Sequence, residues 1–373
     1  MLTSKSIIII HANTVGACLL MRGGALAHLS QSGMLGGVEV IHSTEIIRDE
    51  YILKHTAAVV IARCWSEQHE DMVRHYAKYK RRPDYGFRLL LEYDDVMWDV
   101  DGQQTIPEYN PHRLDTFASG KVIERIAPIV DNVIVSTQWI GLCWKRRFGG
   151  PEPLVVRNYL PCHLYSDRSW YRTDSDIKKP RILYGGSPYH FKDGQLGDFE
   201  GPWVEWLTKA VKDDEAELHM FGPASGWMFK DISDKVICHP YVSNILWPMT
   251  IRDISPDIYI APLQANVFNQ GKSDLKYSEA CAIGSAFMGS FWDSKYCPYA
   301  EQHEKCRVVK DDTPESLREK MHWVCQRDNY NAVMEHQQEH ANSYWLESQT
   351  NLLRILKSLM GDLIEVDYNG HVS

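Results

Sequence analysis

The stretch Ala261–Gly284 reads APLQANVFNQGKSDLKYSEACAIG and joins a strand to a helix through a polar loop. Its apolar start predicts the end of a buried strand. The loop from Asn266 to Gly271 leads into a helix that we expect to begin near Ser273, a good N-cap residue. A strand, a glycine-containing loop and a helix in this order are the parts of a parallel α/β sheet, so the stretch predicts an α/β fold.

The same alternation of short apolar strands and helices runs through both halves of the chain. In the first half it predicts strands at Ser6–Ile10, Val38–Ile41, Ala57–Ala62, Phe87–Tyr93, Val133–Val135 and Leu154–Val156, and helices at Cys18–Ser30, Glu67–Lys80 and Gln138–Phe148. In the second half it predicts strands at Arg181–Tyr184, Leu218–Phe221, Val236–Cys238, Ile258–Ile260 and Ala286–Met288, a helix near Pro202–Val211, and helical structure from Thr313 to about Met360. Two doubly wound units imply a cleft between them, at the carboxyl ends of the strands.

Length and composition are those of a folded protein with more than one domain. A chain of 373 residues exceeds the usual size of a single domain, and 44% hydrophobic with 24% charged residues excludes a mostly disordered chain. We expect domains at residues 1–165 and 166–340, and a helical segment at 341–373 that packs back on the first domain. The apolar run Ile7–Ile10 is far too short for a membrane helix or a signal peptide, so we expect a soluble cytoplasmic protein.

The net charge is unevenly distributed along the chain, and the cysteines show no pattern of a structural site. Residues 1–165 hold 18 basic and 18 acidic residues, so the whole net charge of −9 belongs to the second half. The nine cysteines are scattered and form no C-x-x-C pair, which predicts neither a disulfide framework nor a zinc knuckle.

The residues around the predicted helix start suit a diphosphate. Gly271 permits close approach of the backbone, the first turn of a helix offers unpaired N–H groups, and Lys272 adds a point charge. Glu279 lies about two turns further along, where its carboxylate can accept hydrogen bonds from a ribose diol. The alternative is an ordinary capped helix with a solvated lysine and glutamate.

This stretch resembles the nucleotide-sugar-binding segment of GT-B glycosyltransferases, in particular retaining family 4 and its branch in phage and surface-polysaccharide gene clusters. The pattern F-N-x-x-K-S-x-L-K-x-x-E-x-x-x-x-G is filled at every position from Phe268 to Gly284. Further segments resemble that branch in the same order: EYDDVMWDV (Glu92–Val100), IVSTQWIGLCW (Ile134–Trp144), VVRNYL (Val155–Leu160), RILYGGSPYHFKD (Arg181–Asp193) and SPDIYIAPL (Ser255–Leu263). Gly271 stands where many family 4 enzymes carry a first glutamate, so the sugar is left open.

The resemblance implies a GT-B fold and transfer of a sugar from a nucleotide-sugar, UDP-linked, with retention and without a metal or cofactor in the site. The residues that it assigns to nucleotide-sugar binding are Gly186, Ser187, His190, Lys192, Phe268, Asn269, Lys272, Ser273, Lys276 and Glu279. Gly16 joins them because it follows the first predicted strand, where backbone N–H groups can meet a phosphate. A tight strand–helix turn explains Gly16 equally well.

Three charged residues at predicted strand ends are the catalytic candidates. Asp94 and Asp95 follow a strand together with Glu92, and one of these carboxylates can bind or deprotonate an acceptor hydroxyl. Arg63 ends the strand before, where its charge can face the cleft. The alternatives are turn carboxylates that cap a following segment and a structural ion pair.

Two basic clusters in the first half are the acceptor candidates. Lys80, Arg81 and Arg82 form one, and Arg146 and Arg147 belong to the other. They suit the phosphates of DNA, whose hydroxymethylated bases would then be the acceptor, or an anionic lipid-linked or surface polysaccharide. Solvated helix ends are the plain alternative, and a protein that binds a nucleotide-sugar without catalysis is the alternative of another class. The oligomeric state is not indicated.

Overall fold

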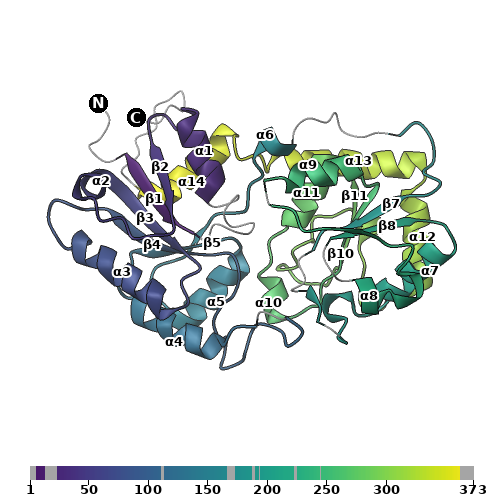
Figure 1. Ribbon diagram of the computed structural model, residues 1–373, viewed down its shortest axis with the longest axis horizontal. Helices are drawn as coiled ribbons and strands as arrows, with labels where there is room; N and C mark the ends of the chain where they lie inside the picture. The colour runs from purple at the N-terminus through teal and green to yellow at the C-terminus, as the bar shows by residue number, and fades with distance from the viewer. Residues whose placement is uncertain are drawn as a thin grey trace.

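The computed structural model of the chain describes residues 6–12, 23–110, 113–165, 173–186, 190–192, 194–221, 225–243 and 245–361. Two parallel sheets lie side by side, each between layers of helices (Figure 1). The predicted pair of doubly wound α/β units is therefore confirmed. Within the described residues, no helix combines the length and the apolar character needed to cross a bilayer.

The first sheet has six parallel strands in the order β2-β1-β3-β4-β5-β6. They are β1 (Ile7–His11), β2 (Glu39–Ser43), β3 (Thr56–Ala62), β4 (Arg88–Tyr93), β5 (Asn132–Val135) and β6 (Leu154–Val155). The helices of this half are α1 (Ala25–Gln31), α2 (Glu50–His55), α3 (Glu67–Lys80), α4 (Thr116–Ile126) and α5 (Gln138–Phe148). Helices cover both faces, α1 one and α3, α4 and α5 the other, which is why the central strands are apolar throughout.

The second sheet has five parallel strands in the order β11-β10-β7-β8-β9. They are β7 (Arg181–Tyr184), β8 (Glu217–Phe221), β9 (Ile237–His239), β10 (Ile258–Ala261) and β11 (Ala286–Gly289). The helices around it are α6 (Cys162–Tyr165), α7 (Trp203–Lys212), α8 (Ser225–Met228), α9 (Trp247–Ile254), α10 (Val267–Gln270), α11 (Leu275–Ile283), α12 (Pro314–Val324) and α13 (Arg327–Asn342). Buried residues of α7, α12 and α13 pack on one face of this sheet, and those of α9 and α11 on the other.

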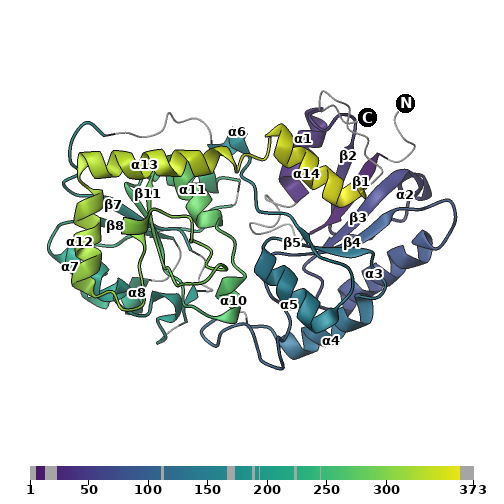
Figure 2. The ribbon, with the colours of Figure 1, turned by 180° about the vertical axis from the view of Figure 1, so that it is seen from behind.

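The last described helix, α14 (Gln349–Met360), lies against the first sheet rather than the second (Figure 2). Its residues Leu352, Ile355 and Leu359 share one apolar cluster with β1 and β3. Arg88 Nη1 of β4 donates to the Ser358 carbonyl oxygen over 2.8 Å. The chain thus passes from the first half to the second and back, while the domain limits drawn after residues 165 and 340 stay predictions.

The observed helices and strands have the predicted bounds where apolar residues recur at regular spacing. Helices α3 and α5 and strand β7 have the predicted bounds. The sequence pattern did not indicate α2, α4, α6 or α9. The predicted helical run after Thr313 is broken into α12, α13 and α14, and Thr313 caps α12, accepting a hydrogen bond from the Ser316 backbone N–H.

Candidate functional site

Charged side chains from both halves of the chain meet at the carboxyl end of the first sheet. Arg63 follows β3, and Asp94 and Asp95 follow β4. From the second half, Lys272 reaches across, with 2.8 Å between its Nζ and Asp95 Oδ1. The structure therefore brings the three residues predicted for catalysis against one predicted for nucleotide-sugar binding.

The guanidinium of Arg63 holds both aspartates. Its Nε lies 2.5 Å from Asp94 Oδ1, and its Nη2 lies 2.8 Å from Asp94 Oδ2 and 3.1 Å from Asp95 Oδ2. Arg63 has a φ of 50°, which is uncommon for a residue with a Cβ atom and recurs at functional sites. The two aspartates are ion-pair partners in this structure, and their action on an acceptor hydroxyl stays a prediction.

The loop that carries Lys272 is seated against the first half of the chain. Trp139 Nε1 of α5 donates to the Val267 carbonyl oxygen over 2.9 Å. A Cβ atom at Gly271 would lie 3.2 Å from the Val96 side chain, so the close approach favours glycine there. Contacts across the two halves, and not the loop alone, therefore fix the position of Lys272.

The aromatic and amide residues of the sequence motif lie in α10, just before Lys272. Phe268 is buried, and its ring centroid lies 4.3 Å from Lys272 Nζ, a cation–π contact. Asn269 is also buried, and its Nδ2 donates to Asp198 Oδ1 over 2.7 Å. The two residues thus shape the surroundings of Lys272 from inside the protein.

Helix α11 begins later than predicted. Its N-cap residue is Asp274, so the prediction of Ser273 as the cap is wrong. The Ser273 hydroxyl instead accepts a hydrogen bond from Asn158 Nδ2 over 2.8 Å. Asn158 belongs to the segment that joins the two halves, which is a tertiary partner that the local pattern does not contain. The shift leaves Lys276 in the first turn of the helix.

Lys276 is a buried cation. Its Nζ has no contact with solvent and no hydrogen-bond partner among the residues that the structure describes, and it lies 4.9 Å from the centroid of the Tyr184 ring. Burial, together with the charge of Lys272, lowers the pKa of Lys276 to about 8, whereas Asp198 and Glu279 act in the opposite direction. Two neighbouring ammonium groups that repel each other form a place for an anion.

Glycine is required in the turn after β7. A Cβ atom at Gly185 would overlap the Tyr259 hydroxyl and the Trp247 ring, and one at Gly186 would overlap the Tyr184 ring. The backbone here approaches its neighbours more closely than a side chain permits. The structure thus places Gly186 next to the tyrosine over which Lys276 lies.

Asp198 is a buried carboxylate at the centre of this region, on the 3₁₀ turn Gly197–Phe199. Its Oδ2 lies 2.7 Å from His190 Nδ1. Its Oδ1 accepts from Tyr109 of the first half over 2.8 Å and from the Gln264 backbone N–H over 2.8 Å. Sequence reasoning missed Asp198, and the only signal for it is an acidic residue between glycines in GQLGDFEG.

Glu279 already has three hydrogen-bond partners. Tyr165 Oη and Trp247 Nε1 donate to its Oε1 over 3.0 and 2.9 Å, and Tyr259 Oη donates to its Oε2 over 3.2 Å. Burial raises the pKa of Glu279, while these three bonds lower it. A carboxylate offers about four acceptor positions, so one remains for a ligand beside those three partners.

For three of the predicted binding residues the structure gives no contact with this cluster. Gly16 and Ser187 are not among the described residues. Lys192 is exposed in a turn in which its backbone N–H and carbonyl pair with Gln195. The described contacts do not connect the Lys192 side chain with Lys272 or Lys276.

The five basic residues predicted for acceptor binding lie at the C-terminal ends of α3 and α5. In a parallel sheet, a helix that follows a strand starts at the carboxyl edge and runs to the opposite edge, away from the cleft. Four of the five are paired: Lys80 with Asp131, Arg82 with Glu50, Arg146 with Asp101, and Arg147 with Asp99. The fifth, Arg81, is the exposed C-cap of α3. The placement and the pairing do not favour the predicted groove into the cleft.

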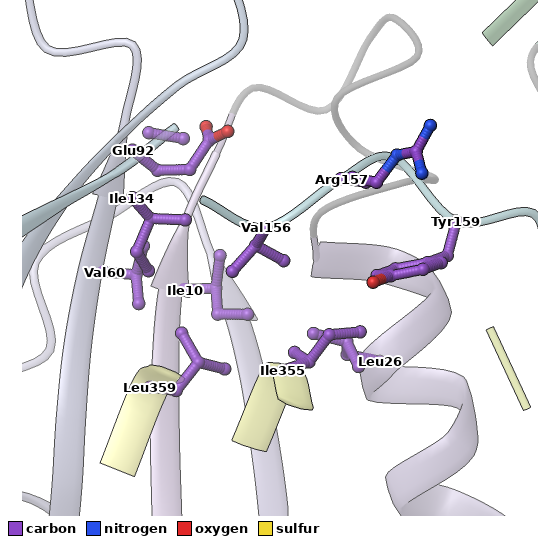
Figure 3. A pocket seen from close by; sticks show the side chains of 11 residues that line it. Ile10, Leu26, Val60, Glu92, Ile134, Val156, Arg157, Tyr159, Ile355 and Leu359 are labelled. Atoms are coloured by element: carbon purple, nitrogen blue, oxygen red, sulfur yellow. The ribbon is translucent and has the colours of Figure 1, made fainter. Parts of the chain in front are cut away.

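An apolar pocket lies between the first sheet and α14 (Figure 3). It is lined by Ile10, Leu26, Val60, Ala62, Glu92, Ile134, Val156, Arg157, Tyr159, Ile355 and Leu359. Glu92 is 2% exposed and lies at one end of this pocket, with its carboxylate directed away from Ile355 and Leu359 (Figure 3). The flanking Leu91 and Tyr93 pack on the other face of the sheet. The sequence grouped Glu92 with Asp94 and Asp95. In the structure Glu92 lines the apolar pocket, whereas the two aspartates contact Arg63.

One group of described side chains has a spacing typical of metal ligands, namely Asp274, Glu301 and His340. Arg157 Nη2 lies 2.8 Å from Asp274 Oδ2, and the Tyr344 hydroxyl donates to the same oxygen. A guanidinium at that oxygen opposes a divalent cation by charge repulsion. We therefore assign these residues to an ion-pair network that links the joining segment to α11.

Comparison with known proteins yields matches among solved structures. No protein-family model matches the chain, and no curated protein matches it in sequence. HepE from Anabaena, in complex with UDP and glucose, superposes with a TM-score of 0.58 at 12% identity, over 96% of this chain and 100% of that one. Sucrose-phosphate synthase from Thermosynechococcus elongatus gives 0.57 at 14% identity, over 94% of this chain and 99% of that one.

A third match is to a longer protein. TarM gives a TM-score of 0.53 at 14% identity over 82% of this chain, which spans only 55% of the length of TarM. These likenesses show the fold. The six-stranded and five-stranded parallel sheets are those of the GT-B fold, so the fold expected from the sequence is confirmed.

Proposed function

We propose that the chain is a glycosyltransferase that takes a sugar from a nucleotide-sugar, with UDP as the nucleotide. Lys276 carries this proposal, because a buried ammonium without a hydrogen-bond partner among the described residues lies beside a second cation, Lys272. A diphosphate supplies the missing charge and acceptor oxygens. The GT-B fold supports the proposal, since the HepE structure of the same fold holds UDP and glucose.

The proposed mechanism uses this charge at the leaving group. The diphosphate gains negative charge as its bond to the sugar breaks, and Lys272, Lys276 and the start of α11 stabilise that charge. In the free protein the Asp95 carboxylate forms an ion pair with Lys272, so the diphosphate has to displace this carboxylate. The sugar is transferred with retention to a hydroxyl that enters from the first half, near Asp94 and Arg63.

The other binding residues follow from this placement. We assign the ribose to Glu279, the turn at Gly186 and Ser187 to the nucleotide, and the neighbourhood of Phe268, Asn269 and His190 to the sugar. Lys192, Ser273 and Gly16 keep a predicted role in binding without a described contact that supports it.

The acceptor is the open part of the proposal. A hydroxymethylated base of phage DNA needs free cations near the cleft, whereas four of the five predicted basic residues are paired with carboxylates. This pairing disfavours any acceptor that these cations would hold, and a lipid-linked or surface polysaccharide without that charge is the second candidate. A nucleotide-sugar-binding protein without catalysis is the remaining alternative.

A panel of nucleotide-sugars tests the function. The protein is incubated with each sugar nucleotide alone, with hydroxymethylated duplex DNA, or with a lipid-linked oligosaccharide, and the products are analysed by mass spectrometry. We expect one UDP-sugar to be consumed and one acceptor to gain the mass of a sugar. Tight binding of UDP without consumption of any UDP-sugar would identify a binding protein instead.

We expect Glu279→Gln to weaken UDP binding by about 1–3 kcal/mol, because it removes a charged hydrogen-bond partner of the ribose. The amide also offers only one oxygen to the three partners that Glu279 now accepts from. Titration calorimetry with UDP measures the effect, and Glu92→Gln, in the apolar pocket, is the matched control. Equal affinities of the two variants would reject the ribose assignment.

We expect UDP affinity to fall above pH 8. The pKa of Lys276 is about 8 in the free protein, so its positive charge is present below that pH and is lost as the pH rises through it. The dissociation constant should rise by up to about tenfold per pH unit, the limit for one proton bound together with the ligand. Calorimetry from pH 6 to 9.5 measures this, and Lys276→Arg, which stays charged, should flatten the profile. A flat profile for the unchanged protein would contradict the role of Lys276.

A further inference from the structure

Asp198 divides its hydrogen bonds between its two oxygens. Oδ1 accepts from Tyr109 Oη, the Gln264 backbone N–H and Asn269 Nδ2, over 2.7 to 2.8 Å. Oδ2 faces His190 Nδ1 at 2.7 Å. The side chain of Asp198 is 1% exposed and that of His190 is 13% exposed, so the pair is shielded from water. One oxygen thus holds the loops together, while the other is directed at a histidine.

His190 is neutral in this pair. Burial, together with the charges of Lys276 and Lys272, lowers the pKa of His190 to about 4, against the effect of Asp198. A neutral imidazole carries one N–H, and the contact with a carboxylate places it on Nδ1. Nε2 is then a hydrogen-bond acceptor.

We propose that Asp198 is a positioning residue that fixes His190 with Nε2 as an acceptor for a hydroxyl group of the transferred sugar. The inference rests on the proposed function and names the residue pair that recognises the sugar. A lone pair on Nε2 repels phosphate oxygens, which are acceptors themselves, whereas a sugar hydroxyl has the proton that Nε2 needs. Asp198 also accepts a hydrogen bond from Asn269, in the helix just before Lys272, so the pair is joined to the loop that carries the cation assigned to the diphosphate.

The isosteric variant Asp198→Asn isolates this role. With its carbonyl oxygen at the Oδ1 position, asparagine keeps the acceptor for Tyr109, Gln264 and Asn269. Its NH₂ group then faces His190 and requires an acceptor at Nδ1, so the ring proton moves to Nε2. The variant therefore keeps the fold and presents a hydrogen-bond donor to the sugar where the protein had an acceptor.

The first measurement is kinetic. We expect Asp198→Asn to lower kcat/KM for the UDP-sugar by about 10- to 100-fold, the cost of one unsatisfied buried group, with UDP affinity changed less than about twofold. His190→Gln should lose a similar factor, and the double variant no more than either single one, because Asp198 acts through His190. A parallel loss of UDP affinity, or additive losses in the double variant, would overturn the proposal.

The second measurement needs no activity. In a ¹⁵N-histidine-labelled protein, the signal that disappears in His190→Gln is that of His190 among the 16 histidines. Its nitrogen shifts should report the Nδ1–H form between pH 6 and 8 and the Nε2–H form in Asp198→Asn. A charged ring, or the same form in both proteins, would overturn the proposal. If no UDP-sugar is consumed at all, the proposed function fails. This spectrum still decides whether Asp198 determines which ring nitrogen of His190 carries the proton.

Discussion

Replacement of Lys272 by alanine is expected to lower kcat for sugar transfer by about 10²- to 10³-fold, the range found when one pre-placed partner of a transition-state charge is removed. Lys272 lies at the meeting point of the two halves, and its cation–π contact with Phe268 holds the ammonium in place when the diphosphate replaces the Asp95 carboxylate. Such a group loses little freedom when the leaving diphosphate becomes more negative. Initial rates at saturating UDP-sugar measure the effect.

The control for this substitution is Lys230→Ala, an exposed lysine on the second sheet's side of the molecule. It removes the same charge from the chain without touching the site, and its kcat should stay within about twofold of the unchanged protein, as for surface substitutions in general. A Lys272→Ala protein that keeps a third or more of the activity would show that the diphosphate binds elsewhere.

Asp198→Ala should destabilise the fold by about 3 kcal/mol or more, because each buried donor that is left without its acceptor costs about 1–3 kcal/mol. The truncation leaves Tyr109, Asn269 and the Gln264 backbone N–H without their acceptor in a buried place. Urea unfolding followed by tryptophan fluorescence measures the loss.

Two comparisons make this stability prediction specific. Asp234→Ala, at an exposed position, should change the free energy of unfolding by less than about 0.5 kcal/mol. Asp198→Asn should lie close to the unchanged protein, because it keeps the acceptor at Oδ1. A stable Asp198→Ala protein would mean that the loops around α10 do not depend on this carboxylate.

Much of the fold was predictable because it depends on local periodicity. Strand β7 and helices α3 and α5 have the bounds that their apolar spacing predicts, since buried strands and amphipathic helices leave different repeats in a sequence. Helix α9 was not predicted. It begins with Trp247 and Pro248, and its role, to bring the Trp247 indole to Glu279, depends on a residue 32 positions away.

The candidate site was predictable only in part. The local pattern indicated Lys272 because glycine, lysine and a helix start are adjacent in the chain, whereas Lys276 followed only from the family resemblance. Asp198 stayed hidden because its partners, Tyr109 and Asn269, are far away in sequence and form a site only after the two halves meet. The acceptor role of the basic clusters stays a prediction, since a sequence shows charges but not the carboxylates that lie beside four of them.

The sequence by itself determined two parallel α/β units and the strand–loop–helix segment that carries the cations, because both follow from interactions among near neighbours. Only the tertiary structure decided which groups face those cations. The Asp95 carboxylate lies 2.8 Å from Lys272, the Lys276 ammonium is buried, and Asp198 joins Tyr109 to Asn269, because each contact depends on segments that are distant in the chain. Burial and long-range pairing fix charge states, and neither is written in the spacing of residues along a chain.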